Sequence, residues 1–575
     1  MQHARTARRF VLLALTLLSA CAASHPSSET ATSDTATSKT ATPKTATEAM
    51  PNGVIGDYLA GRYALSEGDS QTAATDLLKA SALNPGDPEL TLQAFIAALQ
   101  ADRPEAVKLA RRLPDSQVAE LVLADADIKA GRWQAAESRF HGLPRQGLTQ
   151  LLQPLLVAWA QQGDGRTDTA LSTLRPYVEN PRFRGIFALH AAMIADLGGR
   201  NAEAAKLYRA TQTELAQPNL RMAQILASWE ARSGQPAEAQ RILASLPGVS
   251  PELAIALPGL MANLTKRPVP SASDGIAEAY FTFAALLQSQ DANDFALVML
   301  RLALDLRPDF AAARLLAADI EQSEHHPELA LRRLNEVPST DPIIAIVQLR
   351  RAALVDRLGR SDDAMRDLER LARQYPDSPL PDEQRGDILR SKQRFPDAAA
   401  AYDRAIARLD RPGPQDWVLF YDRGVAEERS HAWPKAKADF EHALELSPDQ
   451  PYVLNYLGYS WADMGRHLKE ARQMIERAAE KLPNDGAITD SLGWVMYRQG
   501  DAKEAVSTLE RAVELEPEDS AINAHLGDAY WAVGRKIEAQ YQWRRALTLN
   551  PTKDDAVKLE AKLNTGHPGA VASGK

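Results

Sequence analysis

Residues 489–519 read TDSLGWVMYRQGDAKEAVSTLERAVELEPED, and the spacing of small and apolar residues in this stretch decides the fold. Gly493 is followed twelve positions later by Ala505, and an apolar residue, a small residue and Pro517 come four, seven and twelve positions after that alanine. Helix axes approach to about 8–10 Å only where the side chains at the crossing are small. The spacing therefore predicts a helical hairpin whose helices cross at Gly493, with Pro517 ending the second helix.

The same pattern recurs along almost the whole chain, with a spacing close to 34 residues, and residues 454–485 and 523–553 show it most clearly. The small residues of the predicted first helices are Gly61, Ala94, Ala124, Ala158, Ala192, Ala227, Ala284, Ala318, Ala352, Gly386, Gly424, Gly458, Gly493 and Gly527. The alanines of the predicted second helices are Ala73, Ala106, Ala136, Ala170, Ala204, Ala239, Ala296, Ala330, Ala364, Ala398, Ala436, Ala471, Ala505 and Ala539. Paired matches at a near-constant period predict stacked hairpins that bury one continuous core.

This pattern resembles the tetratricopeptide repeat (TPR), a helix–turn–helix of about 34 residues. The resemblance implies an all-α fold: a right-handed superhelical solenoid of about 14 repeats, in which the first helices line a concave groove. Four second helices meet a proline about one turn early, so we expect them to be shorter. These prolines are Pro114, Pro144, Pro247 and Pro338.

The repeat spacing is interrupted once, between Ala239 and Ala296. We expect one helix there, interrupted or bent at Pro258, followed by a Pro/Ser-rich link. Residues 248–275 are therefore interpreted as a break between a first array of about six repeats at 53–247 and a second of about eight at 276–552. Residues 553–565 are expected to form a polar-faced capping helix, which such arrays need at their ends, and residues 566–575 a frayed tail.

The start of the chain has the features of a targeting signal. Residues 1–9 carry three arginines, and residues 10–18 form an apolar run too short to span a bilayer. Leu18-Ser19-Ala20-Cys21 resembles the lipobox of bacterial lipoproteins, which implies removal of residues 1–20 and acylation of Cys21, the one cysteine of the chain. Because residue 22 is alanine, the resemblance places the protein on the periplasmic face of a Gram-negative outer membrane. An ordinary signal peptide with an incidental cysteine is the alternative.

Residues 21–52 would then form a tether. The unit Thr-Ala-Thr recurs about every five residues between positions 30 and 47, and the segment has little apolar surface to bury. We expect it to be disordered and to act as a spacer between the lipid and the repeats.

Composition and motifs argue against catalysis and against nucleic-acid binding. The net charge of −9 at pH 7 is too acidic for a general nucleic-acid binder. The sequence has no phosphate-binding loop, serine elbow or zinc-protease signature. His325-His326 is the one adjacent histidine pair, and a solvated turn is the alternative to a metal site there. We therefore expect no enzyme activity, no catalytic residue, no metal and no cofactor.

In TPR proteins the groove-facing residues lie three before, one after and four after the small residue of each first helix. These positions and their charged neighbours combine aromatic, Asn, Asp and Arg side chains, which suits a peptide or protein partner. The partner-binding candidates are Tyr421, Asn455, Tyr459, Asp490, Trp494, Tyr497, Arg498, Asp528 and Trp531. We expect Tyr459, Trp494 and Trp531 to be exposed in the groove. Side chains assigned to packing instead are Trp461, Met496, Tyr530, Trp543 and Phe440.

Residues 453–471, 488–505 and 522–547 resemble a group of long TPR lipoproteins of Gram-negative outer membranes. Some members are adaptors that bind a carboxy-terminal processing protease in the periplasm and promote degradation of peptidoglycan hydrolases. The resemblance implies a membrane-tethered scaffold that recruits a periplasmic enzyme, such as a protease acting on cell-wall hydrolases. Two alternatives remain: an assembly lipoprotein for an outer-membrane export or barrel-insertion machine, and a hydrolase built into residues 248–275.

Overall fold

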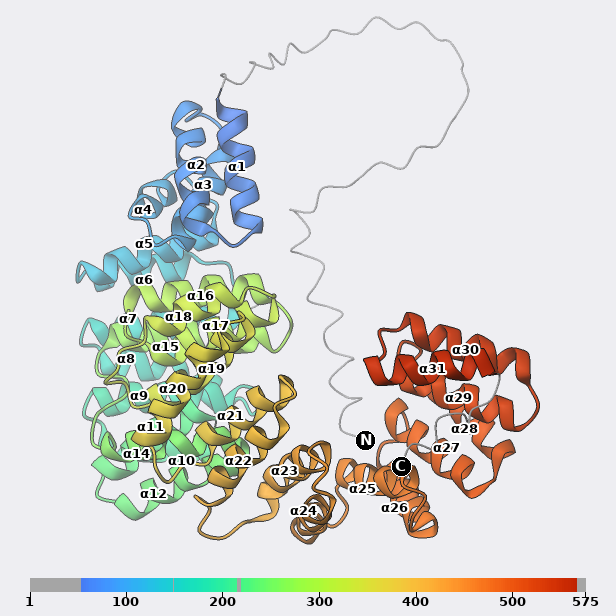
Figure 1. Cartoon of the computed structure of the whole chain (residues 1–575). Helices are drawn as coiled ribbons and strands as arrows, with labels where there is room; N and C mark the ends of the chain where they lie inside the picture. Colours follow the sequence, from blue (N-terminus) through green and yellow to red (C-terminus); the bar gives the residue numbers. More distant parts are fainter. Residues whose placement is uncertain (1–52, 148, 215–218, 566–575) are drawn as a thin grey trace, which may run out of the picture. The chain divides into compact units, whose positions relative to one another are not determined.

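The computed structural model describes residues 53–147, 149–214 and 219–565, so Cys21, the predicted tether and the predicted tail lie outside the described residues. The described residues form helices and no strand (Figure 1). They are arranged as fourteen hairpins, each with a first and a second helix. The predicted all-α repeat solenoid is therefore confirmed.

The helix bounds follow the predicted register. The first helices are α1 (Val54–Ser66), α3 (Pro88–Gln100), α5 (Gln117–Lys129), α7 (Thr149–Gly163), α9 (Arg184–Leu197), α11 (Leu220–Arg232), α15 (Ala272–Gln288), α17 (Ala311–Ser323), α19 (Ile344–Arg357), α21 (Leu380–Ser391), α23 (Trp417–Arg429), α25 (Pro451–Asp463), α27 (Gly486–Gln499) and α29 (Ser520–Ala532). The second helices are α2 (Ser70–Leu83), α4 (Glu105–Ala110), α6 (Trp133–Gly142), α8 (Thr167–Glu179), α10 (Asn201–Glu214), α12 (Pro236–Ala244), α16 (Asn293–Leu306), α18 (Pro327–Asn335), α20 (Ser361–Gln374), α22 (Phe395–Ile406), α24 (Trp433–Leu446), α26 (Leu468–Lys481), α28 (Ala502–Leu515) and α30 (Lys536–Thr548). A short 3₁₀ turn, η5 (Pro414–Asp416), precedes α23.

The predicted glycines lie at helix crossings. A Cβ atom added to Gly493 would lie 2.6 Å from Leu509, and one added to Gly527 would lie 2.5 Å from Trp543. In both hairpins the neighbour is the residue four positions after the second-helix alanine. All fourteen second-helix alanines are buried. Close approach at these positions therefore holds each hairpin together.

Second-helix length also follows the proline positions. The four helices expected to be short, α4, α6, α12 and α18, have 6, 10, 9 and 9 residues. Full-length examples such as α16 and α28 have 14. The prediction of early termination is confirmed, because a proline ends each helix by removing a donor and crowding the preceding turn.

Residues 248–275 differ from the expectation of one bent helix. The segment holds the end of α13 (Leu246–Val249), the 3₁₀ helix η4 (Pro251–Ala256) and α14 (Leu257–Ala262), and α15 already begins at Ala272. Pro258 lies in the first turn of α14, where its missing N–H costs no hydrogen bond, so it starts a helix instead of bending one.

The chain divides into two compact units at a different place from the predicted break. Unit 1 ends at Val347 and unit 2 begins at Gln348, so the boundary falls within α19. The hairpins α15–α16 and α17–α18 therefore belong with the first six repeats. The physical reason is that α15 and α16 pack against first helices far earlier in the chain.

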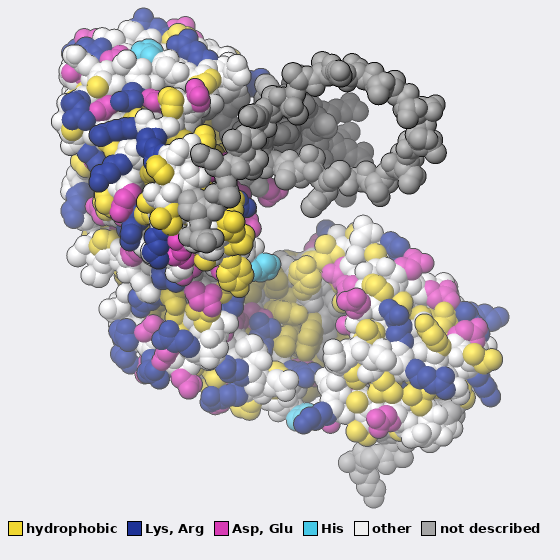
Figure 2. Space-filling view, turned by 90° about the horizontal axis from the view of Figure 1, so that it is seen from above, with side chains coloured by type: hydrophobic (Ala, Val, Ile, Leu, Met, Phe, Trp, Pro, Cys, Tyr) yellow, Lys and Arg dark blue, Asp and Glu magenta, His cyan; other side chains and the backbone are white. Residues whose placement is uncertain are grey.

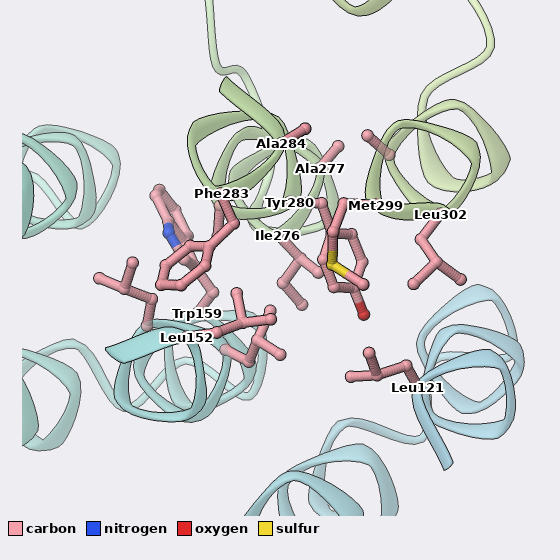
Figure 3. Packing of buried hydrophobic residues seen from close by; sticks show 14 of the residues in the cluster. Leu121, Leu152, Trp159, Ile276, Ala277, Tyr280, Phe283, Ala284, Met299 and Leu302 are labelled. Carbon is pink, nitrogen blue, oxygen red and sulfur yellow. The ribbon is translucent and has the colours of Figure 1, made fainter. Parts of the chain in front are cut away.

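In unit 1 the chain covers its own first helices. Helix α15 packs along α7 and against α9, and α16 packs against α5 and α3 (Figure 1). Figure 3 shows Ile276, Tyr280 and Phe283 of α15 pointing toward Trp159 of α7 and Leu121 of α5. Trp159 and Tyr280 are fully buried. The face that a TPR groove would offer to a partner is here part of one continuous core.

Buried polar contacts fix α15 in this position. Tyr280 donates a hydrogen bond to Asp125 of α5 at 3.0 Å. Arg221 of α11 and Glu278 of α15 form an ion pair at 2.7 Å with side chains only 8% and 2% exposed. Removing one partner of such a pair leaves a buried charge uncompensated, so these contacts specify the position of α15 strongly.

Unit 2 ends with the expected cap. Helix α31 (Lys553–Thr565) packs against α30, and its Leu559 is buried in the same apolar cluster as Trp543. Lys562 of α31 donates to Asp528 of α29 at 2.7 Å. Helix α31 spans the residues 553–565 that the sequence predicts for a capping helix.

The surface carries mixed charge. On the face seen in Figure 2, Lys and Arg side chains are interspersed with Asp and Glu, and neither sign dominates it. Among the described residues, none of the helices combines the length and the apolar character needed to cross a bilayer.

Candidate partner-binding face

Five of the nine candidate residues come together in unit 2, on the first helices α25 and α27, around His525 of α29. The five are Tyr459, Asp490, Trp494, Tyr497 and Arg498. We call this set with His525 the unit 2 aromatic face. The helices lie side by side because each hairpin stacks on the previous one, which brings equivalent positions of successive repeats into contact.

Trp494 is at the centre of this face, and it is not exposed as predicted. Only 8% of its surface is exposed. The indole stacks on the His525 ring at 4.0 Å and on Tyr497 at 5.1 Å, and the Arg498 guanidinium lies 5.6 Å from its centre. The expectation of exposure is wrong because the next first helix supplies a ring that covers Trp494.

Two carboxylates predicted as partner-binding are engaged within unit 2. Asp490 is 5% exposed and accepts a hydrogen bond from His525 Nδ1 at 2.9 Å. Asp528 is 4% exposed and accepts hydrogen bonds from Trp543 Nε1 at 2.9 Å and Lys562 Nζ at 2.7 Å. Asp528 therefore joins α29 to its second helix and to the cap, which is a structural role that the groove rule does not foresee.

His525 is charged more readily than an ordinary histidine. Burial opposes its charged form, but the Asp490 carboxylate more than offsets this effect, so the pKa of His525 is raised above its usual value. Burial and the carboxylates of Asp463, Asp490 and Asp555 likewise raise the pKa of Tyr459. The face thus combines aromatic rings with a histidine–carboxylate pair.

Several buried polar atoms of the described residues have no hydrogen-bond partner, and two of them lie on α25 and α27, the helices of the unit 2 aromatic face. These two are the indole N–H of Trp494 and the amide oxygen of Asn455, on neighbouring first helices. Buried polar groups are nearly always paired, so an unpaired donor and an unpaired acceptor are unusual. One donor and one acceptor are also what a peptide unit of a bound chain can satisfy.

The two outer candidates, Tyr421 and Trp531, lie half-buried on α23 and α29. The Tyr421 ring meets Tyr456 edge-on at 5.8 Å, and burial raises its pKa to about 12. The Trp531 ring lies 5.6 Å from Trp543, with the Lys536 ammonium 5.1 Å from its centre. Tyr421, Tyr459, Tyr497 and Trp531 keep partial exposure and are the aromatic side chains that a partner can reach.

Of the residues assigned to packing, Phe440 and Trp543 are fully buried, and Met496 and Tyr530 are 8% and 7% exposed, so these four assignments are confirmed. Trp461 is half-buried.

Sequence reasoning missed His525. It lies two positions before Gly527, a position that the groove rule does not include. Tyr456 lies two positions before Gly458, and its hydroxyl donates to Glu428 of the preceding first helix at 3.1 Å. A polar or aromatic residue at this position reaches back to the previous repeat, and this signal is available in the sequence.

A cavity of about 220 Å³ lies where residues 248–275 meet α11 and the start of α17. Its lining includes Arg221, Ser228, Arg267, Arg307 and Asp341 but no histidine or cysteine. The Ser228 hydroxyl donates to the Lys266 carbonyl oxygen at 2.8 Å and accepts from Arg232 Nε at 3.3 Å.

The histidine pair lies in the turn before α18. His325 has a left-handed backbone conformation and His326 precedes the first residue of that helix. Within the described part of the chain, no group of three His, Cys, Asp or Glu side chains is placed to hold a metal ion.

Comparisons with known proteins agree with this architecture. Residues 271–419 match the model of a tetratricopeptide repeat-like domain, and residues 491–553 match that of a tetratricopeptide repeat. The chain contains tetratricopeptide repeats.

The two curated relatives reported below match only part of this chain in sequence. A TPR repeat-containing protein of Pseudomonas aeruginosa is 31% identical over 153 residues, which cover 27% of this chain and 25% of that protein. The Hsp70–Hsp90 organizing protein of Triticum aestivum is 30% identical over 106 residues, or 18% of this chain and 17% of that protein. These matches span a quarter or less of each relative. Among solved structures, the APC/C hetero-tetramer Cut9–Hcn1 has a TM-score of 0.38 at 14% identity, covering 89% of this chain and 96% of that one.

Proposed function

We propose that the protein is a membrane-tethered adaptor that holds a periplasmic enzyme, such as a protease, together with its cell-wall hydrolase substrates. Cys21 is the proposed site of the lipid anchor, and residues 22–52 are the proposed tether. A flexible tether of roughly 30 residues confines partners to about millimolar effective concentration, which favours encounters between molecules held on one surface.

The observation that carries the binding part of this proposal is the unit 2 aromatic face. Rings on the first helices α25 and α27 gather around His525 of α29. The Trp494 N–H and the Asn455 amide oxygen, on α27 and α25, have no partner among the described residues. In unit 1, by contrast, α15 and α16 cover the equivalent helices. Unit 2 is therefore the part of the array where we place the recognition of a partner chain.

Tyr459 and Tyr497 are the residues with which to test this assignment. Both are half-buried, so Tyr459→Ala and Tyr497→Ala remove contact surface with less loss of packing than substitution of the buried Trp494. Tyr541→Ala is the matched control, because Tyr541 on α30 is 61% exposed and lies outside the aromatic face.

The experiment is affinity purification from an envelope extract, with the full chain as bait. The recovered partner is identified, and its affinity for the parent chain and for each variant is then measured. A soluble protease bound by the chain, with affinity reduced about tenfold or more by the two groove variants and unchanged by the control, supports the proposal. An outer-membrane barrel or a polysaccharide synthase as partner supports the assembly alternative. Substrate turnover by the purified chain alone would support the hydrolase alternative. If all three variants bind the partner as tightly as the parent chain, the unit 2 aromatic face is not the partner-binding site.

A further inference from the structure

The cavity of unit 1 lies at the place where the repeat pattern is interrupted. Its lining includes parts of α11, of the link that follows α14, of the turn between α16 and α17, and of the turn between α18 and α19. Its volume of about 220 Å³ is several times the roughly 30 Å³ that one water molecule occupies in the liquid. The cavity therefore has room for one small organic molecule.

Most of the charged side chains in the lining are paired with a group of opposite charge inside unit 1. Because these charges are balanced there, none of them needs a ligand. The pairs are Arg221–Glu278 at 2.7 Å, Arg267–Asp196 at 3.0 Å, and Arg307 with Asp274 and Asp309, each at 3.5 Å.

The carboxylate of Asp341 is different, because it has no cation beside it. It is half-buried and accepts a hydrogen bond from the Ile343 N–H at 2.9 Å, but no Lys or Arg nitrogen of the described residues lies within 4 Å of it. Burial raises the pKa of Asp341, and the Ile343 N–H and the charges of Arg221 and Arg307 offset only part of this effect. A cation in the cavity would compensate this carboxylate.

The cation of the lining that lacks a carboxylate is Lys266. Its carbonyl oxygen accepts the Ser228 hydroxyl at 2.8 Å, which holds residue 266 at the cavity. Its side chain is exposed, and in the described part of the chain no carboxylate lies within 4 Å of its ammonium. The Pro268 carbonyl oxygen, two residues further on, accepts from Arg307 Nη1 at 2.9 Å, whereas Arg307 Nη2 donates no hydrogen bond to the described residues. The cavity thus offers donors for an anion as well as an acceptor for a cation.

We propose that the cavity binds an α-amino acid as its zwitterion. The ligand carboxylate lies against the Lys266 ammonium and Arg307 Nη2, and the ligand ammonium lies against the Asp341 carboxylate. One molecule then pairs both uncompensated charges, whereas a simple anion or a simple amine pairs only one of them. Leu243 and Leu260, which are buried and line the cavity, suit a small aliphatic side chain such as that of alanine, valine or leucine.

The site would give a small-molecule ligand to a protein that we propose as an adaptor, and it does not depend on that role. The ligand would contact the link after α14 and the turn between α18 and α19 at the same time. Because a ligand stabilises the folded state that binds it, the carboxyl end of unit 1 should become more stable when the cavity is filled.

Isothermal titration calorimetry of the purified full chain tests the ligand class. The probes are L-alanine, L-valine and L-leucine, and the matched controls are propionate and propylamine, each of which lacks one of the two charged groups. At least one of the amino acids should bind with a dissociation constant below about 1 mM, and both controls should bind about tenfold more weakly or not at all.

Two substitutions test the residues. Asp341→Asn keeps an acceptor for the Ile343 N–H but removes the charge, and Lys266→Gln removes the ammonium, so each should weaken amino-acid binding about tenfold or more. Asp377→Asn and Lys503→Gln are the matched controls, because both side chains are exposed in unit 2, and they should leave binding unchanged. Unchanged helix content and melting temperature of the Asp341 variant exclude unfolding as the cause.

Hydrogen exchange locates the ligand. Saturation with the tightest of the three amino acids should slow exchange in residues 260–268 and 338–343, and slowing confined to other segments would place the ligand elsewhere and overturn the proposal. It is also overturned if none of the three amino acids binds at up to about 10 mM. Propionate binding as tight as that of alanine, or equal affinity of the parent chain, Asp341→Asn and Lys266→Gln, overturns it as well.

Discussion

Unit 1 and unit 2 contain the same pair of side chains at the same repeat positions. Trp159 and Trp494 each lie one position after the small residue of a first helix, and His190 and His525 lie 31 residues further on, two positions before the next small residue. In unit 1, Trp159 Nε1 donates to His190 Nδ1 at 3.0 Å. In unit 2 the rings stack at 4.0 Å, and His525 Nδ1 faces Asp490 instead.

We expect one residue to decide this difference. Three positions before the small residue, unit 1 has Leu155, which is fully buried, and unit 2 has Asp490. In unit 1, burial keeps His190 neutral, and its Nδ1 accepts the Trp159 N–H. In unit 2, His525 turns its Nδ1–H to the Asp490 carboxylate, and the N–H of Trp494 has no partner among the described residues. The same repeat framework therefore yields a dry core in unit 1 and a polar, partly exposed face in unit 2.

The largest effect that we expect is on the stability of unit 1, from weakening the packing of α15 on the earlier first helices. Tyr280→Ala removes a fully buried ring and the hydrogen bond to Asp125, so it should destabilise unit 1 by about 3–5 kcal/mol. Urea denaturation of the full chain, followed by hydrogen exchange of each unit, measures this change.

Tyr459→Ala is the counterpart in unit 2. Because Tyr459 is half-buried, its removal should lower the unfolding free energy by only about 1 kcal/mol. Equal losses from the two substitutions would contradict the claim that α15 is a core element and that the unit 2 face is a surface.

The second effect is acid sensitivity of unit 1. Burial lowers the pKa of His190 to about 4, because the ring lies between Trp159 and Thr282 without access to water. The unfolded chain binds a proton near the ordinary histidine pKa of about 6.5, so the contribution of neutral His190 is present above that pH and lost as the pH falls toward 4. The loss should approach about 3 kcal/mol.

His190→Asn separates this effect from general acid unfolding. The asparagine amide oxygen can accept the Trp159 N–H but cannot be protonated in this range, so the variant should lose less stability than the parent between pH 6.5 and pH 4. Parallel stability curves for the two chains would show that His190 is not the sensor.

A smaller effect is expected at the helix crossings. Gly493→Val places a side chain where a Cβ would already lie 2.6 Å from Leu509, so unit 2 should lose about 1–3 kcal/mol. Gly56→Ala in α1 is the control, since a Cβ there meets nothing within 4 Å, and it should stabilise α1 by about 0.5–1 kcal/mol. Thermal unfolding of both variants tests whether crowding, and not glycine replacement as such, is the cause.

Much of the fold could be predicted because the repeat encodes contacts between neighbours. Gly493 and Ala505 report a crossing within one hairpin, and Pro517 reports the end of its second helix, all within 30 residues. The cover over unit 1 could not be predicted in this way. Tyr280 contacts Asp125 across 155 residues, and nothing in the local period shows that α15 packs on α7 instead of extending the stack.

The site was predicted in part for the same reason. The rule of three before, one after and four after the small residue brought Tyr459, Trp494 and Tyr497 together. It treated each first helix alone, however, and so missed His525, which reaches back from the next repeat to cover Trp494. It also offered Asp528 to a partner, whereas Lys562 of the capping helix already binds that carboxylate. Exposure depends on neighbouring repeats and caps, and a single-helix rule does not contain them.

The smallest effect, and the one that tests the comparison most directly, is the opposite pH dependence of unit 2. The raised pKa of His525 means that its pair with Asp490 contributes fully below the ordinary histidine pKa of about 6.5 and is lost as the pH rises through the raised value. Asp490→Leu recreates the unit 1 arrangement. Without that carboxylate, burial and the Lys562 ammonium oppose the charged form of His525 and the Asp528 carboxylate favours it. Because burial has the largest effect of these, we expect the pKa of His525 to fall below the ordinary value and its ring to be free to accept the Trp494 N–H. Histidine titration by NMR of chains labelled at histidine, with His525→Asn to assign the signal, measures this reversal. If the pKa of His525 stays above 6.5 in Asp490→Leu, residue 490 does not decide between the buried Trp159–His190 hydrogen bond of unit 1 and the Trp494–His525 stack of unit 2. The packing of α15 on α7 and α9 would then be the cause of the difference.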